Sequence, residues 1–336
     1  MKIQTRKGTG MAITRRQWLA VGLSIPLTLA AGTQAAISGS ASGARTALTL
    51  LVGAAPGGGW DTVARELQAA MRENGIVSNP QVVNVPGAAG TIALEQLLQM
   101  RGQSDVVMIT GTVMLGGVVV NDSPHDLTAT TPIAHLADDY EAIVVPADSS
   151  LKTLDDLVAA LKEDPGAVSF GGGSLGGTDH LLAGLLAQEV GVNPSEVNYV
   201  PFAGGGEAVS ALLSHSVTVG VSGYNEFADQ VTAGNLRLLG IASPKAVAGV
   251  DGPTFSEAGY KAYLPNWRGA VAPAGLDAED AAELTAILSE TVKTPEWKDA
   301  LKRNKWVDAY QEGKEFREFV ESETSRVTKT IEELGL

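Results

Sequence analysis

The chain of 336 residues contains no cysteine. It therefore has no disulfide bond, no thiolate metal site, no cysteine nucleophile and no cysteine that could carry a lipid anchor. Its four histidines, His125, His135, His180 and His215, are scattered, and neither a His-x-x-x-His pair nor an acid-rich calcium loop is present. We therefore expect neither a metal nor a cofactor.

Long apolar runs are also missing after residue 44, so no membrane-spanning helix is predicted. Residues 1–44 combine a basic start, an apolar run at Leu19–Ala31 and small residues leading to Ala35 and Ala44. This pattern indicates an export signal that is cleaved near one of these two alanines. An exported protein with no anchor would be lost from a cell without an outer membrane, so the predicted compartment is the periplasm.

The arginine pair Arg15-Arg16 precedes Trp18 and Leu19, which resembles the twin-arginine export motif. Trp18 departs from that motif, which usually carries Phe at this position. An ordinary secretory signal with a chance arginine pair is the alternative.

Positive charge is scarce. The chain has 24 basic and 38 acidic residues, a formal net charge of −14. Removal of residues 1–44 takes away five basic residues and no acidic ones, which leaves 19 against 38 and a charge of −19. Such a chain repels nucleic acid and anionic lipid surfaces, so neither is expected as a partner. The roughly 290 remaining residues fit two domains of ordinary size.

Glycine, in contrast, is abundant, and much of it lies in turns between a predicted strand and a predicted helix. The first turn, Pro56–Gly59, follows a strand at Leu48–Val52 and precedes a helix at Asp61–Asn74. Such a turn can point bare backbone N–H groups at an anion. Similar turns are predicted at Pro86–Gly90, Gly171–His180 and Ala203–Glu207.

Strands and helices alternate along the rest of the chain, which is typical of an α/β protein with ligands bound beyond the strand ends. Late elements are a strand at Trp267–Ala272 and amphipathic helices at Ala278–Thr291 and Lys314–Leu334, while Ser222–Glu226 is predicted as a turn. We expect two α/β lobes joined by two crossings. The first would comprise residues 45–143 and 243–336, and the second residues 144–242.

Two enzyme-like motifs overlap in one glycine turn. Ser174 in Gly172–Gly176 matches the G-x-S-x-G elbow of serine hydrolases, but no acid and later His are well placed for a triad. The same turn matches G-x-G-x-x-G, yet the next strand does not end in the acid that a dinucleotide ribose requires. No GK[ST] follows any glycine turn. No catalytic residue is predicted, and Ser174 is interpreted as a ligand donor.

Four charged side chains have two interpretations each. Asp61 can pair with Arg65 one turn later and shape its own turn, or it can contact a ligand. Asp179 and Glu207 can stabilise their helix starts or reach a ligand. Arg268, next to Trp267, is a candidate ligand contact or a surface arginine beside a core tryptophan.

Seven segments, taken together, resemble the substrate-binding receptors of tripartite tricarboxylate transporters, also called Bug-type receptors. These segments are PGGGWDTVAR, NVPGAAGTIAL, GGGSLGGTDH, NYVPFAGGGEAVSALL, VSGYNEF, LRLLGIAS and NWRGAVAP. The resemblance covers nearly the whole mature chain, and PGAAG departs from the usual PGAGG. It implies a type II periplasmic binding fold that closes on a small carboxylate. It also implies delivery to membrane permease subunits. GGGSLGGTDH and NWRG are similar to the tricarboxylate branch, which favours a citrate-like ligand.

The resemblance and the turns together predict a non-enzymatic, monomeric receptor for a di- or tricarboxylate. An α/β serine hydrolase and a ligand receptor for a sensor kinase are the alternatives. The predicted ligand-binding residues are those of the glycine turns and of the strand ends beside them, namely Gly58, Gly59, Trp60, Asp61, Gly87, Ala88, Ala89, Gly90, Thr110, Thr112, Ser174, Gly177, Thr178, Asp179, His180, Gly204, Gly205, Tyr224 and Arg268.

Overall fold

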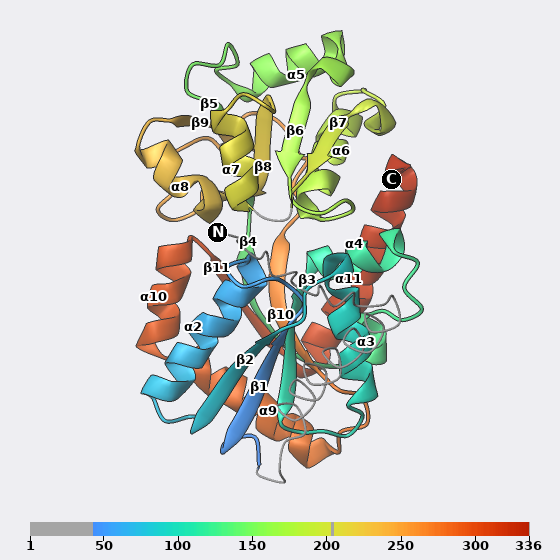
Figure 1. Ribbon diagram of the computed structural model, residues 1–336, viewed down its shortest axis with the longest axis vertical. Helices are drawn as coiled ribbons and strands as arrows, with labels where there is room; N and C mark the ends of the chain where they lie inside the picture. The colour runs from blue at the N-terminus through green and yellow to red at the C-terminus, as the bar shows by residue number, and fades with distance from the viewer. Residues whose placement is uncertain (1–42, 203–204, 336) are drawn as a thin grey trace, which may run out of the picture. The chain divides into compact units, whose positions relative to one another are not determined.

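Two mixed β-sheets organise the residues that the computed structural model describes, 43–202 and 205–335 (Figure 1). The first sheet has the strand order β11-β4-β10-β3-β1-β2. Strands β1, β2 and β3 are parallel, whereas β10 and β11 run antiparallel to their neighbours. Its strands are β1 (Ala47–Val52), β2 (Asn79–Asn84), β3 (Val106–Gly111), β4 (Thr131–Asp139), β10 (Asn266–Ala272) and β11 (Val307–Glu312).

The second sheet has the order β7-β6-β8-β5-β9. Strands β7, β6 and β8 are parallel, and β5 is antiparallel to both β8 and β9. Its strands are β5 (Glu141–Pro146), β6 (Ser169–Gly172), β7 (Asn198–Pro201), β8 (Val219–Gly223) and β9 (Leu236–Ile241).

Ten α-helices are described in residues 43–202 and 205–335. They are α2 (Gly59–Glu73), α3 (Thr91–Gln99), α4 (Thr112–Val120), α5 (Leu154–Glu163), α6 (Thr178–Glu189), α7 (Gly205–Leu213), α8 (Tyr224–Thr232), α9 (Ala278–Thr291), α10 (Pro295–Asn304) and α11 (Gly313–Leu334). A short 3₁₀ turn, η1 (Ala88–Gly90), precedes α3. Within this described part of the chain, none of the helices has both the length and the apolar character that a membrane span requires.

Alternation along β5 shows how the second sheet is buried on both faces. Ile143 and Val145 belong to a core that includes Phe170, Leu182 and Phe255. Their neighbours Ala142 and Val144 lie in a second core with Leu212 and Phe227. Because successive strand residues point to opposite faces, one apolar strand supplies both layers.

The chain passes between the sheets twice, and the two passages lie side by side. Only Tyr140 separates the end of β4 from the start of β5, and the chain returns between β9 and β10. Asn266 is paired with Asp139 in the sheet register, and Figure 1 shows β10, in orange, running from the first sheet toward the second. The predicted lobe limits lie near these passages: residue 144 is inside β5 and residue 242 directly follows β9. The division into lobes at these limits stays a prediction.

Several predicted elements need correction. The turn predicted at Ser222–Glu226 is wrong, since Gly223 ends β8 and α8 begins at Tyr224. Two helices do not close the chain alone, because α10 and β11 lie between α9 and α11. Helix α4 was not predicted because its apolar residues surround the whole helix and give no periodic stripe. The export signal lies, up to residue 42, outside the described residues, and so does Gly204.

Candidate functional site

The first glycine turn is held by the side chain of Asp61. One carboxylate oxygen, Oδ2, accepts hydrogen bonds from the backbone N–H of Gly57 at 2.8 Å and from Nε of Arg65 at 2.7 Å. The other oxygen accepts one from Nδ2 of Asn84 at 2.9 Å. Burial alone would raise the pKa of Asp61, but the hydrogen bonds from Arg65, Gly57 and Asn84 outweigh burial and lower that pKa. The carboxylate of Asp61 therefore shapes the turn and anchors it to β2.

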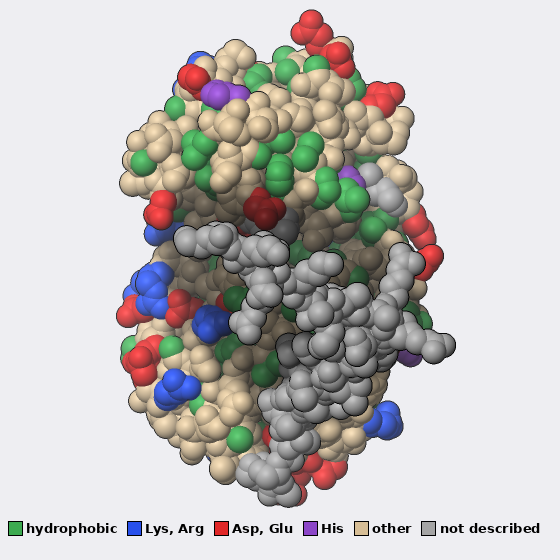
Figure 2. Space-filling model, viewed as in Figure 1, with side chains coloured by type: hydrophobic (Ala, Val, Ile, Leu, Met, Phe, Trp, Pro, Cys, Tyr) green, Lys and Arg blue, Asp and Glu red, His purple; other side chains and the backbone are tan. Residues whose placement is uncertain are grey.

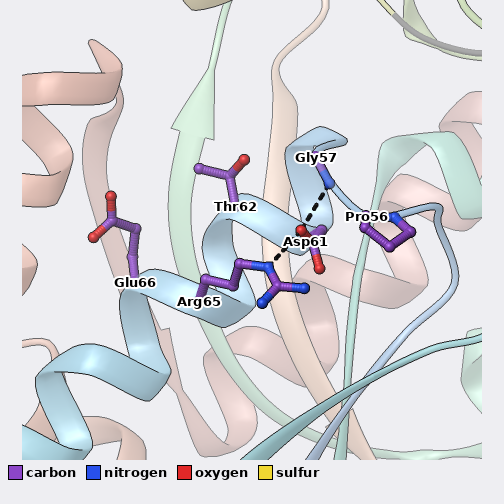
Figure 3. A pocket seen from close by; sticks show the side chains of 6 residues that line it. All are labelled: Pro56, Gly57, Asp61, Thr62, Arg65 and Glu66. Carbon is purple, nitrogen blue, oxygen red and sulfur yellow. Dashed lines mark hydrogen bonds and ion pairs between the residues drawn. The ribbon is translucent and has the colours of Figure 1, made fainter.

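A pocket of about 480 Å³ opens beside this turn, between Pro56 and the first two turns of α2. Figure 3 shows Asp61 pointing toward the turn, whereas Glu66 points away from it. Arg65 reaches back toward Asp61, and half of its side chain stays exposed. An anion at this mouth would meet one arginine and two carboxylates, both of which are already paired, Asp61 with Arg65 and Glu66 with Arg303.

Helix α2 begins without a side-chain cap. Its N-cap is Gly58, and among the described residues no side chain caps the backbone N–H groups of its first turn. The first N–H groups of any helix have no partner within the helix and carry partial positive charge. The guanidinium of Arg268 lies directly against this turn, because a Cβ on Gly59 would approach Nη2 of Arg268 to 2.8 Å. The uncapped N–H groups at the start of α2 and the buried guanidinium of Arg268 are therefore close neighbours.

The loop before α3 is strained. Ala88 and Ala89 both adopt left-handed backbone conformations, with φ of 47° and 52°. Each such conformation costs a non-glycine residue about 1–2 kcal/mol. Gly117 of α4 makes room for the loop, since a Cβ there would come within 2.6 Å of the Cβ of Ala89. Strain of this kind gathers at functional sites, where the surrounding structure holds it.

The indole of Trp60 connects the turns at the carboxyl ends of β1, β2 and β3. A Cβ on Gly90 would lie 2.8 Å from its ring, and a Cβ on Gly111 would lie 3.2 Å from its Nε1. The ring is buried, and its N–H has no partner among the described residues. These two glycines are therefore needed for close packing around a single tryptophan.

The two threonines predicted at the end of β3 have different surroundings. The hydroxyl of Thr112 donates to the carbonyl of Pro265 at 2.8 Å and accepts from the N–H of Trp267 at 3.2 Å. It fastens the start of α4 to β10. The hydroxyl of Thr110 is fully buried and has no partner within the described part of the chain.

The turn between β6 and α6 repeats the design of the first turn. The carboxylate of Asp179 accepts a hydrogen bond from the N–H of Gly173 at 2.7 Å, and the hydroxyl of Tyr199 donates to the carbonyl of Gly173 at 2.9 Å. Gly177 is the N-cap of α6 and provides no side-chain cap. A Cβ on Gly116 of α4 would lie 1.9 Å from the carbonyl oxygen of Gly176, so this turn touches the helix that follows β3.

The same turn lacks the geometry of a hydrolase. Ser174 is exposed in the bend before α6. Nδ1 of His180 accepts a hydrogen bond from the N–H of Gly176 at 3.1 Å, and its ring packs on Tyr199 with centroids 4.3 Å apart. Burial lowers the pKa of His180 to about 4. His215 is exposed and pairs with Asp148 at 3.6 Å, so neither histidine acts as a base for Ser174.

The remaining predicted residues of the second sheet lie at helix starts. Thr178, the first residue of α6, is fully buried, and its hydroxyl has no partner among the described residues. Gly205 is the first residue of α7. Tyr224, the first residue of α8, is buried in the apolar core that contains Phe227.

Gly87, the predicted residue at the start of the strained loop before α3, has φ of 134°.

One ion pair and one amide–carboxylate hydrogen bond that the sequence did not predict lie where the chain passes between the sheets. Nη2 of Arg268 donates to Oδ2 of Asp139 at 3.0 Å, and both side chains are buried. Nδ2 of Asn266 donates to Oε1 of Glu141 at 2.7 Å. Each of these bonds joins the β4–β5 passage to β10. The signal in the sequence is a charged run, Asp138 to Glu141, between two apolar strands.

Two further acids, on helices α6 and α8, interact electrostatically with this cluster. Burial and the charge of Asp139 raise the pKa of Asp179 to about 6, against the opposing effects of Gly173, Glu141 and Arg268. Glu226, in the first turn of α8, has an exposed side chain, but protein atoms around its carboxyl group displace water from it, and this desolvation raises its pKa to about 7. The charges of Asp179 and Asp139 add to this effect. Figure 2 shows an acidic side chain in the shaded recess between the two sheets.

The acids do not form a metal site. Among the described residues, no three His, Cys, Asp or Glu side chains are grouped so that they could hold a metal ion. The site therefore consists of uncapped helix starts, one buried arginine and a set of carboxyl groups.

Comparisons with known proteins agree with this architecture. A family model described as "Tripartite tricarboxylate transporter family receptor" matches residues 63–336. A protein from the tcbD-tcbE intergenic region of Pseudomonas sp. strain P51 is 29% identical over 304 residues, which is 86% of each chain. Protein BugT of Bordetella pertussis is 26% identical and is covered to 94%, against 91% of this chain.

Solved structures share the fold. A TctC solute-binding protein from Polaromonas has a TM-score of 0.68 at 27% identity, with 85% of this chain and 98% of that one covered. MatC from Rhodopseudomonas palustris, solved with malate, has a TM-score of 0.74 at 22% identity, covering 85% and 99%. A second R. palustris protein, solved with adipate, has a TM-score of 0.77 at 21% identity, covering 86% and 97%.

Proposed function

We propose that this chain, which belongs to the tripartite tricarboxylate transporter receptor family, captures a small di- or tricarboxylate in the periplasm and delivers it to the permease subunits of such a transporter. Members of the family are solute-binding receptors rather than enzymes, and they are periplasmic. Export through the predicted signal at residues 1–44 would bring the chain to that compartment.

The meeting of Arg268 with the uncapped start of α2 carries the proposal. A carboxylate placed there would accept hydrogen bonds from the backbone N–H groups at Gly59 and Trp60 and would face a buried cation. Each hydrogen bond to a charged group contributes about 1.5–3 kcal/mol. Two or three such bonds approach the roughly 8 kcal/mol of a micromolar complex before the cost of immobilising the ligand is subtracted.

The size of the ligand follows from relatives of similar architecture. Malate and adipate occupy two proteins of this fold, and both are small dicarboxylates. The resemblance of GGGSLGGTDH and NWRG to the tricarboxylate branch adds citrate as a candidate. The matching start of α6, with its N-cap at Gly177, would receive the distal end of such a ligand.

A thermal-shift screen of the mature protein with malate, adipate, aspartate and citrate tests the proposal. A ligand at 100 times its Kd stabilises the folded state by about 2.7 kcal/mol, so at least one of the four should raise Tm clearly. If none of them moves Tm at millimolar concentration while the protein unfolds cooperatively, the proposal is wrong.

Variants of the arginine locate the site. Arg268→Gln should abolish the shift, but it leaves Asp139 buried and unpaired, which can cost 3–5 kcal/mol. The double variant Arg268→Gln with Asp139→Asn keeps a neutral hydrogen-bonded pair in the same space and should also lose binding. Arg317→Gln, on an exposed face of α11, is the matched control and should bind as the original protein does.

A further inference from the structure

Helix α11 packs against the first sheet near its start and against a helix of the second sheet at its end. The ring of Phe316, in its first turn, lies edge-on to the ring of Trp267 in β10, with centroids 6.0 Å apart. Leu334, the last residue of the helix, lies on α6, because a Cβ on Gly184 would approach its Cδ1 to 2.8 Å. Both Leu334 and Ile331 are buried. Since α6 belongs to a core of the second sheet, α11 bridges the two sheets by packing alone (Figure 1).

Helix α4 meets the start of α6 at the same place. A Cβ on Gly116 would lie 1.9 Å from the carbonyl oxygen of Gly176, and a Cβ on Gly176 would lie 2.3 Å from Cγ2 of Val120. The turn before α6 therefore touches α4 at two residues that are about one helical turn apart. Ile331 of α11 lies beside this contact, 3.7 Å from the same Cβ position of Gly116. We name the whole junction the three-helix contact, and its residues are Gly116, Val120, Gly176, Gly184, Ile331 and Leu334.

The three-helix contact consists of close packing, since none of its six residues is charged or polar in its side chain. Such packing is sensitive to separation, because a gap of about 0.5–1 Å already loses a quarter to a half of the attraction between two atoms. On the other side of the chain passages, Asn225 of α8 and Asn304 of α10 share a single amide hydrogen bond of 3.3 Å (Figure 1). The three-helix contact is therefore the stronger obstacle to movement of one sheet away from the other.

We propose that the three-helix contact is a clasp that holds the two sheets together in the protein without ligand, so that residues outside the ligand site set the affinity. The chain joins the sheets covalently at β4–β5 and at β9–β10, and a movement about these passages must break or shift the contact. Gly176 directly precedes Gly177, the N-cap of α6, so the contact also fixes the position of that uncapped helix start.

Population arithmetic connects the clasp to affinity. A protein whose binding arrangement is populated only to a fraction f binds its ligand 1/f times more weakly. Loss of the three-helix contact lowers this fraction and leaves every group of the ligand site in the protein. The effect on affinity rests on the proposed receptor function, whereas the effect on the arrangement of the sheets does not.

Two variants break the three-helix contact in opposite ways. Gly116→Ala adds a methyl group whose nearest atoms outside its own helix belong to Gly176, while alanine is the better residue for the interior of α4. Leu334→Ala removes the side chain that covers Gly184 and leaves the glycine turn untouched. The matched controls are Gly166→Ala, where the nearest atom is 3.4 Å away, and Glu332→Ala on the exposed face of α11.

The lack of cysteine allows a pair of spin labels to be attached at chosen positions. Gln99→Cys, at the end of α3, and Glu196→Cys, on the 3₁₀ turn η4 (Pro194–Glu196) beside α6, are exposed and belong to different sheets. Pulsed double electron–electron resonance on the mature protein without ligand should give one narrow distance distribution for the labelled parent and for both controls. Gly116→Ala and Leu334→Ala should each move part of the population to longer distances.

Ligand titration supplies the second readout. The carboxylate that raises Tm of the parent protein most should bind each variant about tenfold more weakly if the competent fraction falls to about one tenth. Saturation with that ligand should return the distance distribution to the one of the parent. The controls should keep the Kd of the parent.

The outcomes decide the clasp and the receptor separately. The distance shift must appear in each of the two variants that still unfolds cooperatively, and an unchanged distribution in any such variant overturns the clasp whatever its Kd. A distance shift with an unchanged Kd overturns the connection to affinity. A distance shift in a protein that binds none of the carboxylates leaves the clasp standing and overturns the proposed receptor function.

Discussion

Two groups of helices in this protein begin in different ways. Helices α5, α9 and α10 start with a side chain that binds their first backbone N–H groups: Thr153, Asp277 and Thr294. Helices α2, α3, α4, α6 and α8 start after a glycine, and no side chain caps them. Helix α11 also lacks a side-chain cap, but it follows a glutamate.

The difference lies in what each helix start can still bind. A capping side chain accepts a hydrogen bond from a backbone N–H group that the helix leaves unpaired. Thr153 and Asp156 do this reciprocally, because the side chain of each accepts a hydrogen bond from the backbone N–H of the other. A glycine leaves such N–H groups free and lets neighbouring atoms come close. All five glycine starts follow a strand or its turn: four lie in the glycine motifs PGGG, PGAAG, GGGSLGG and SGY, and the fifth is Gly111 at the end of β3. The capped helix starts therefore gain stability from their caps, whereas the uncapped starts leave backbone N–H groups without a side-chain acceptor.

Adding a methyl group at a tight glycine start should have the largest effect. Gly111 has an extended backbone that any residue adopts, so only space demands glycine there. A Cβ at this position would lie 2.0 Å from the carbonyl oxygen of Trp267, and backbone must move to relieve the contact. Gly111→Ala should cost about 3 kcal/mol of unfolding free energy, at the upper end of overpacking effects. Gly58→Ala, where the nearest atom is 3.4 Å away, is the control for chemical denaturation. Equal stability of the two variants would contradict the packing account.

Removing a cap from the other group should have a smaller effect, confined to stability. Thr153→Ala loses the bond from the N–H of Asp156 and should destabilise the protein by about 1 kcal/mol. Thr153→Ser keeps a hydroxyl and should cost much less. Denaturation measures the loss, and ligand titration should show an unchanged Kd. A weaker Kd in Thr153→Ala would mean that the capped helices also take part in binding.

Installing a cap at an uncapped start should have the smallest effect on stability and a clear one on binding. Gly58 has φ of −76° and ψ of 168°, which suits a capping serine. Gly58→Ser should stabilise the protein by a few tenths of a kcal/mol, because its hydroxyl would bind the N–H of Trp60 or Asp61. The same bond competes with a ligand carboxylate, so Kd should weaken several-fold relative to Gly58→Ala. Tighter binding by Gly58→Ser would show that those N–H groups do not face the ligand.

Much of the fold is predictable from the sequence because its strands are apolar and its turns rich in glycine. The strand at Leu48–Val52 and the helix at Ala278–Thr291 agree with β1 and α9. The prediction missed elements that have no clear local signal in the sequence. Helix α8 starts directly at the end of β8, and β11 is a half-exposed edge strand of polar composition. A helix that begins with no loop looks like a turn in the sequence.

The glycine turns of the site and Arg268 could be predicted from the sequence, but the side chains that contact Arg268 could not. Runs of glycine near strand ends indicated the open turns, and the sequence placed Arg268 among the candidates. The partners of Arg268 could not be found, because Asp139 and Glu141 come from a passage between sheets whose position depends on tertiary pairing. The two interpretations of Asp61 were separable only once Gly57, Arg65 and Asn84 were seen around its carboxylate.

The most direct test follows the backbone N–H groups themselves. Deuterated mature protein, labelled with ¹⁵N, is titrated with whichever of malate, aspartate, adipate and citrate raises Tm most, and its amide resonances are recorded. The N–H resonances of Gly59, Trp60 and Thr178 should move downfield as hydrogen bonds to carboxylate form, while those of the capped Asp156 and Asp280 stay in place. Saturation of the protein with no movement at Gly59 and Trp60 would contradict the claim that uncapped helix starts hold the ligand.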